Sequence, residues 1–150
     1  MRPRSSLVTT FIAAAIAPAF WTTPSLAKQC YAPDARAQER AFSRAVVSEG
    51  GKTVWLGGQT GSPTSNFEQQ AREAFASLDK TIKAVGGSGV QDMVTMTVFI
   101  TDVRNGDRLT QIRKEIFKDC FPGSALITVT GLARPGLQIE IQGIAVIGGK

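Results

Sequence analysis

A single carboxylate in an otherwise apolar segment is the most prominent candidate for chemistry in this sequence. Glu140 lies between Ile139 and Ile141, and a carboxylate inside an apolar strand is costly unless it faces solvent, an interface or a cleft. In a cleft its pKa would be raised, and the group could position or activate a water molecule. The alternative is an ordinary solvated sheet face, because Gln138 and Gln142 alternate with the apolar residues in the same way.

Two turn segments are further candidates for ligand contacts. Residues 57–61 (GGQTG) follow an apolar strand pattern, and glycines let backbone amides approach an anionic ligand closely. The alternative is a bulge or a tight turn. Ser124, in the segment 121–124 (FPGS), could donate to a ligand carboxylate or simply finish a turn. No base is visible that would make it a nucleophile.

The composition excludes several classes of site. The 150 residues include no histidine, which rules out a Ser-His-Asp triad, a Cys-His pair and any histidine metal site. Two cysteines are too few for a structural zinc site. The formal charge of +5 is mild and no Lys/Arg run accompanies it, so we expect no nucleic-acid partner.

The N-terminus has the pattern of an export signal. Arg2 and Arg4 precede an apolar stretch at residues 7–21, and residues 25–27 (SLA) end in small side chains. We expect residues 1–27 to be a signal peptide cleaved before Lys28, which lowers the formal charge from +5 to +3 and leaves a periplasmic or secreted protein without a membrane segment. An uncleaved anchor is the alternative, but the stretch is shorter than the roughly 20 residues of a membrane span.

Export bears on the two cysteines. Disulfides persist in oxidising compartments, and both Cys30 and Cys120 remain after cleavage. We therefore predict a Cys30–Cys120 disulfide. The alternative is two unpaired thiols.

Hydrophobic periodicity predicts one α+β domain over residues 42–150, preceded by a polar N-terminal arm at residues 28–41. The expected order is β-β-α-β-α-β-β, with a mixed sheet, two helices on one face and a hairpin at each end. The expected elements are strands 42–48 and 53–56, a helix from the cap Asn66 to residue 85, strand 93–101, a helix from the cap Asp107 to residue 120, and strands 125–132 and 137–147. The strand 93–101 carries threonines on one face, which suits a surface covered by another subunit.

These segments, in this order, resemble the reactive intermediate deaminase (RidA/YjgF) family. The matching stretches are residues 42–46 (FSRAV), 57–59 (GGQ), 74–78 (AFASL), 96–102 (MTVFITD), 121–124 (FPGS) and 137–141 (LQIEI). The resemblance implies a chorismate-mutase-like fold, a homotrimer and a small-molecule cleft between subunits. It also implies hydrolysis of enamines or imines derived from amino acids to ammonia and a 2-keto acid, without metal or organic cofactor.

The resemblance places the site on named residues. Glu140 would hold the attacking water as the catalytic residue, and Phe42, Gly57, Gly58, Gln59, Ser124 and Leu126 would contact the ligand. Ser124 stands where the family has the arginine that pairs with the substrate carboxylate, Phe42 where it has a tyrosine, and Gly57 where it has a serine.

These departures leave open what the cleft does. Because a bidentate guanidinium is hard to replace, we expect deaminase activity to be weak, altered or lost. Arg44 and Arg134 are the candidates to supply another cation. The alternatives are a non-catalytic ligand-binding or scavenging trimer and, more remotely, a ribonuclease or translation inhibitor of the kind ascribed to some relatives.

Overall fold

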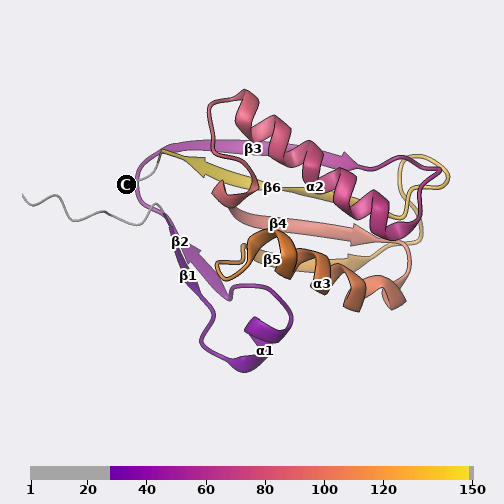
Figure 1. Ribbon diagram of the computed structural model, residues 1–150, viewed down its shortest axis with the longest axis horizontal. Coiled ribbons are helices and arrows are strands. Elements are labelled where there is room, and N and C mark those ends of the chain that lie inside the picture. Colours follow the sequence, from indigo (N-terminus) through magenta and orange to yellow (C-terminus); the bar gives the residue numbers. More distant parts are fainter. Residues whose placement is uncertain (1–27, 149–150) are drawn as a thin grey trace, which may run out of the picture.

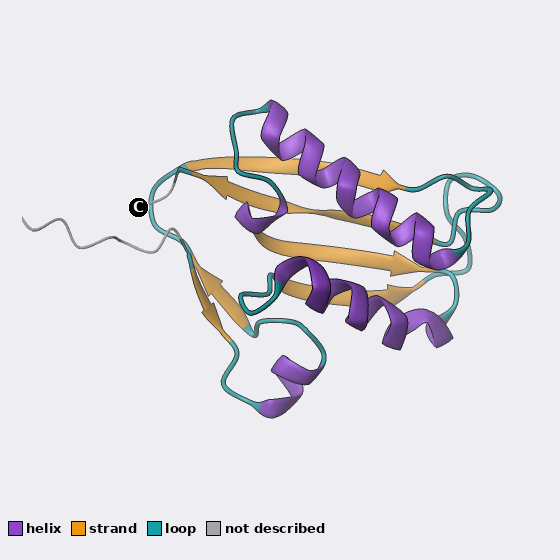
Figure 2. Cartoon of the chain, in the orientation of Figure 1, coloured by secondary structure: helices purple, strands orange, loops and turns teal. Residues whose placement is uncertain are grey.

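The computed structural model describes residues 28–148. The predicted signal peptide, residues 1–27, lies outside the described residues. The main sheet has four strands, β3 (Lys52–Thr60), β4 (Met93–Ile100), β5 (Gly123–Thr128) and β6 (Ile139–Ile147), in the order β3-β6-β4-β5. Helices α2 (Phe67–Ala84) and α3 (Gly106–Phe117) cover one face, as Figure 1 and Figure 2 show. This confirms the predicted mixed α+β architecture.

The core lies between this sheet and the two helices. Met96, Val98 and Ile100 of β4 are fully or almost fully buried, because alternate residues of a strand point to the same face. The helix α2 buries Phe75 and Leu78, which follow the predicted 3.6-residue spacing. Within residues 28–148, no helix covers the other face of the sheet (Figure 1).

The predicted caps are only partly correct. Asn66 caps α2, since its side chain accepts from the Gln69 backbone N–H at 2.9 Å, but the Gln69 side chain bonds to Glu73 instead of closing a capping box. The cap of α3 is Asn105 and not Asp107, which lies in the first turn. Two short 3₁₀ helices, η1 (Val90–Asp92) and η2 (Val103–Asn105), precede β4 and α3.

Both predicted hairpins are wrong. Strand β5 runs parallel to β4 after the α3 crossover, and β6 inserts antiparallel between β3 and β4. At the other end, β2 (Ala45–Val47) pairs with β1 (Gln29–Tyr31) and not with β3. Alternation identifies which residues form strands but not their partners, which tertiary packing decides.

The predicted polar arm, residues 28–41, is structured and fixed to the domain. It contains β1 and a short helix α1 (Ala35–Glu39). The predicted disulfide is confirmed: Cys30 and Cys120 are bonded, with their Cα atoms 5.6 Å apart. Further along, the Ser43 hydroxyl donates to the Phe121 carbonyl oxygen at 2.6 Å. The arm therefore lies along the segment that opens β5, as Figure 1 shows for α1 and the β1–β2 ribbon beside α3 and β5.

A buried glutamine of α2 fixes the loops at the opposite end of the sheet. The Gln70 side-chain amide donates to the carbonyl oxygens of Ser65 at 2.8 Å and Gly136 at 2.9 Å, and its oxygen accepts from the Gln138 backbone N–H at 2.9 Å. Gln70 is 0% exposed. It therefore satisfies three backbone groups, one of them two residues before Glu140.

We expect Gln70→Leu to lower the free energy of unfolding by roughly 2–3 kcal/mol, because it leaves backbone groups unsatisfied where water has little access. Urea denaturation measures the change. The neighbouring Gln69→Leu is the matched control, since Gln69 is exposed and its replacement should cost less than about 0.5 kcal/mol. Equal costs for the two variants would contradict this role of Gln70.

Candidate functional site

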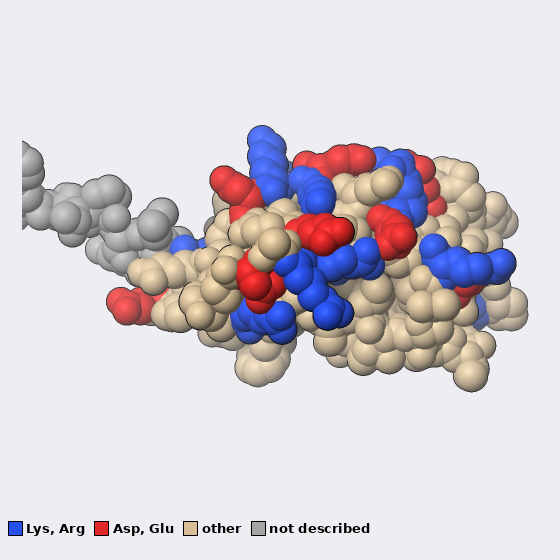
Figure 3. All heavy atoms as spheres, turned by 90° about the horizontal axis from the view of Figure 1, so that it is seen from below, with Lys and Arg blue, Asp and Glu red and all other residues tan. Residues whose placement is uncertain are grey.

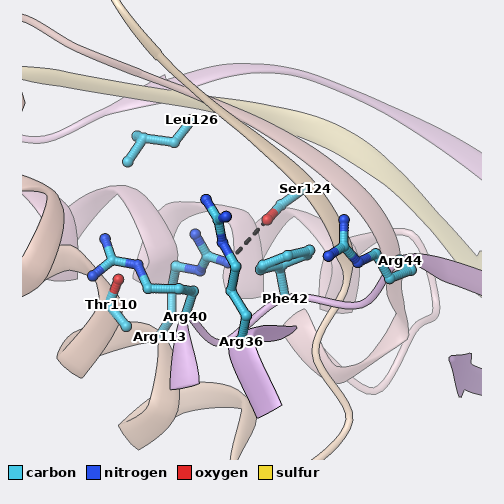
Figure 4. A pocket seen from close by; sticks show the side chains of 8 residues that line it. All are labelled: Arg36, Arg40, Phe42, Arg44, Thr110, Arg113, Ser124 and Leu126. Carbon is cyan, nitrogen blue, oxygen red and sulfur yellow. Dashed lines mark hydrogen bonds between the residues drawn. The ribbon is translucent and has the colours of Figure 1, made fainter. Parts of the chain in front are cut away.

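A cavity of about 330 Å³ lies where the arm, α3 and β5 meet. Four of its lining residues are arginines, and no carboxylate lines it. Figure 4 shows these side chains, and the Phe42 ring separates Arg44 from the other guanidinium groups in that view. The lining residues are Arg36, Arg40, Phe42, Arg44, Thr110, Arg113, Ser124 and Leu126.

Arg113 is the buried member of this set. It lies four residues from both Leu109 and Phe117, on the buried face of α3, and only 3% of it is exposed. Its Nη2 donates to the Ser124 hydroxyl at 2.9 Å (dashed in Figure 4) and to the Ala41 carbonyl oxygen. Its buried Nε has no hydrogen-bond partner among the described residues.

The environment of Arg113 favours an anion. Burial, with a smaller contribution from the charge of Arg40, lowers the pKa of Arg113 from its ordinary value to about 10. The group is still protonated at neutral pH, so a positive charge is held out of water without a counter-ion among the described residues. Such a charge is costly unless a ligand pairs with it.

The arm supplies Arg36 and Arg40, and Arg44 lies just before β2. Arg40 pairs with Asp107 at 2.5 Å and Arg44 with Asp34 at 3.0 Å. Arg44 also lies 5.4 Å from the centre of the Phe42 ring, within range of a cation–π contact. Arg36 makes no ion pair within the described residues. Figure 3, which views the α1 side of the molecule, shows basic side chains gathered with acidic ones beside them.

Asp34 fixes the orientation of this arm. Its side chain caps α1 by accepting from the Ala37 backbone N–H at 2.8 Å. That hydrogen bond, and then the one from Arg44, lower the pKa of Asp34. Ala41 follows the helix with φ of 54°, a left-handed conformation that is unfavourable for alanine and accompanies the turn of its carbonyl oxygen toward Arg113.

Glu140 lies at a different place. It is half-buried on β6, opposite Thr60 of β3 and Phe99 of β4. The β3 ladder is irregular between Leu56 and Gln59, and a Cβ atom on Gly58 would collide with the Glu140 carboxylate. Gly58 therefore leaves room for Glu140. The carboxylate makes no hydrogen bond or ion pair to the described residues, so it is free to accept one from a ligand or a water.

Within one chain, the structure does not bring Glu140 and Ser124 together. Ser124 is opposite Met96, a core residue on the helix side of the sheet, whereas Glu140 is opposite Phe99 on the open face. Paired residues share a face, so the two side chains point to opposite faces. Glu140 is not among the residues that line the arginine cavity.

The other predicted site residues divide between these two places. The cavity brings together four of them: Phe42, Arg44, Ser124 and Leu126. Gly58 of β3 lies beside Glu140, whereas Gly57 does not approach it. The Gln59 side chain accepts from the Ser77 hydroxyl of α2 at 2.5 Å, which indicates a structural role. Arg134 is exposed in the loop before β6 and does not line the cavity.

The sequence prediction missed Arg113, Arg36 and Arg40. The signal for Arg113 was present, because a charged residue spaced four from two apolar residues of one helix face must be buried or paired. Arg36 and Arg40 are also four residues apart, but that spacing brings two side chains together only in a helix, and no helix was predicted in the arm.

The described residues offer no cluster of three or more His, Cys, Asp or Glu side chains that could hold a metal ion. No helix in this part of the chain is long and apolar enough to cross a membrane.

Comparison with known proteins identifies the class to which this fold and cavity belong. The family model described as "Endoribonuclease L-PSP" matches residues 32–147. The chain therefore belongs to this family, which is the RidA/YjgF family that its motifs resemble.

Several members are similar over most of the chain. A human 2-iminobutanoate/2-iminopropanoate deaminase is 28% identical over 71% of this chain and 80% of its own length. The RutC family protein YjgH of Escherichia coli is 34% identical over 71% of this chain and 83% of its own length. A Rid-family protein of Yersinia pestis, YyfB, shares the fold with a TM-score of 0.73 at 19% identity, over 81% of this chain and all of that one.

Proposed function

We propose that this protein binds a small carboxylate compound and hydrolyses amino-acid-derived imines weakly or with altered substrate preference, using Arg113 in place of the arginine that the family carries at the position of Ser124. The observation that carries this proposal is the 2.9 Å hydrogen bond from Arg113 Nη2 to Ser124 Oγ. The guanidinium of Arg113, on α3, therefore reaches the side chain of Ser124, which stands where the family has its arginine.

The arginine cavity and the Glu140 carboxylate each supply a group that imine hydrolysis needs. A guanidinium in a partly water-excluded cavity can pair with the ligand carboxylate. Glu140, with no partner among the described residues, can accept a proton from a water that attacks the imine carbon. The human relative is named a 2-iminobutanoate/2-iminopropanoate deaminase, which favours imines of small amino acids as the first substrates to test.

A homotrimer would join the two places across a subunit boundary. The open sheet face exposes Trp55 (78%) and Ile127 (41%), and large exposed apolar groups on one face favour an interface. The sheet ends in β3 at one edge and β5 at the other. When three such sheets close around an axis, β5 of one subunit faces β3 of its neighbour, and Glu140 lies beside that β3.

Export is part of the proposal. The N-terminal pattern of residues 1–27 and the Cys30–Cys120 disulfide both support a periplasmic or secreted protein. A purely ligand-binding trimer is the second candidate function. The separation of Glu140 from the arginine cavity within one chain favours it, because binding at Arg113 does not require Glu140.

Imine hydrolysis by the purified protein tests the proposal. An amino-acid oxidase generates the imine, semicarbazide traps what is not hydrolysed, and the natural protein is compared with Ser124→Arg and Glu140→Gln. We expect slow hydrolysis by the natural protein. In Glu140→Gln the hydrolysis rate should fall by a factor of about 10²–10⁴. Activity in Ser124→Arg alone would make ligand binding the natural role. Activity that survives Glu140→Gln would remove Glu140 from the mechanism.

A further inference from the structure

The number of arginines in the cavity exceeds what one carboxylate requires. A single bidentate guanidinium matches one carboxylate, yet four guanidinium groups line this cavity and no acidic residue does. Two of the four are balanced at the rim, by the Arg40–Asp107 and Arg44–Asp34 pairs. The two positive charges left over belong to Arg36 and Arg113.

Three of the four guanidinium groups fall into an inner and an outer set, while Arg44 lies apart from them beyond the Phe42 ring (Figure 4). The inner set is Arg113 with Ser124, joined by a hydrogen bond and fixed on α3 and β5. The outer set is Arg36 in α1 and Arg40 at the C-cap of that helix, four residues apart and therefore on the same side of it. Both sets line the same cavity, so one ligand can contact both.

The outer set stays available for a ligand. Asp107, the partner of Arg40, has an 84% exposed side chain, and an exposed pair of this kind contributes little. Arg40 can therefore exchange this partner for a ligand anion at small cost. The arm that carries the outer set is bonded to the domain through Cys30–Cys120, and Ser43, two residues after the arm, bonds to Phe121, so little ordering is needed on binding.

We propose that the cavity binds a small dicarboxylate, with one carboxylate at Arg113 and Ser124 and the second at Arg36 and Arg40. This rests on the proposed function, in which the inner group holds the carboxylate of an imino acid. The substrate class that follows is the imines of acidic amino acids, whose side chain carries the second carboxylate. A cavity of about 330 Å³ accommodates a ligand of this size.

Calorimetric titration of the purified protein at fixed ionic strength tests this. The probes are 2-oxoglutarate as the dicarboxylate, 2-oxobutanoate as the monocarboxylate and phosphoglycolate as a phosphate ester. We expect 2-oxoglutarate to bind at least tenfold more tightly than 2-oxobutanoate. In the double variant Arg36→Gln/Arg40→Gln the two affinities should become equal within about threefold, with that for 2-oxobutanoate little changed. The charge-matched double variant Lys80→Gln/Lys83→Gln, on the exposed side of α2, should keep the tenfold preference.

The outcomes separate this inference from the proposed function. Equal affinities in the natural protein, or equal weakening of both ligands in the double variant, would overturn the second subsite while binding at Arg113 stands. Tighter binding of phosphoglycolate would overturn the dicarboxylate assignment. A dicarboxylate preference without imine hydrolysis would keep the subsite and remove the deaminase activity. Absence of binding by either 2-keto acid would overturn both.

Discussion

Replacing Arg113 by methionine is expected to weaken binding of 2-oxobutanoate by a factor of about 10²–10³ while leaving the protein folded. A buried charge-assisted pair between a protein group and its partner is worth about 2–5 kcal/mol, and Arg113 is the one buried guanidinium of the cavity. Methionine has a similar length and no charge, so the helix face of α3 stays filled. Calorimetric titration measures the affinity and thermal unfolding checks the fold.

The stability of the same variant provides a second readout. The pKa of Arg113 is lowered to about 10, so the unfolded chain binds more protons than the folded one between about pH 10 and the higher pKa of an arginine in the unfolded chain. The cost of burying the charge is therefore present below pH 10 and is relieved as the pH rises above it. A shift of this size corresponds to about 3 kcal/mol, against which methionine loses the hydrogen bonds to Ala41 and Ser124, each worth about 1–3 kcal/mol. Since these two effects are of similar size, we expect the melting temperature of Arg113→Met to stay close to that of the natural protein.

A second substitution tests whether a guanidinium at the position of the family arginine can replace that of Arg113. Adding Ser124→Arg to Arg113→Met returns a guanidinium to the position where the family carries one, and we expect it to restore much of the affinity. Undiminished binding by Arg113→Met alone would show that Arg113 does not hold the carboxylate, and the arm arginines would be the next to replace.

Removing the disulfide is expected to have the largest effect on stability. Cys30 and Cys120 are separated by 90 residues, and the chain-entropy model assigns about 4–5 kcal/mol to a loop of that length. Since small domains have only about 5–15 kcal/mol of net stability, Cys30→Ser/Cys120→Ser should unfold at much lower urea concentration. It should also bind 2-oxobutanoate and 2-oxoglutarate less tightly, because the arm supplies Arg36 and Arg40 to the cavity and leads directly into Phe42.

Reduction tests the same point without substitution. Reducing agent should lower the urea midpoint of the natural protein to that of the double serine variant, and it should leave the variant unchanged. A difference below about 1 kcal/mol with unchanged affinity would contradict the view that the disulfide holds the arm in place.

The sequence predicted which segments form helices and strands better than it predicted how the strands pair. The 3.6-residue spacing of Phe75 and Leu78 identified α2, and the alternation of Met96, Val98 and Ile100 identified β4, since both patterns are set locally by which face is buried. The pairing of β5 with β4 and of β2 with β1 depends on contacts between distant segments, which alternation does not encode.

The sequence predicted those site residues that a motif position identifies one at a time. The family motifs indicated Ser124, Phe42 and Glu140, and the presence of only two cysteines allowed the disulfide to be predicted. The cluster of arginines could not be predicted from those motifs, because it depends on where α1 packs. The faces on which Ser124 and Glu140 lie follow from the strand register, which two wrong hairpins had obscured.

A crystal structure of the protein with 2-oxobutanoate tests the central claim most directly, because it locates the ligand carboxylate. We expect the carboxylate oxygens within about 3 Å of the Arg113 guanidinium. A carboxylate held elsewhere, with Arg113 still bonded only to Ser124 and Ala41, would contradict the claim that Arg113 has taken over the role of the family arginine.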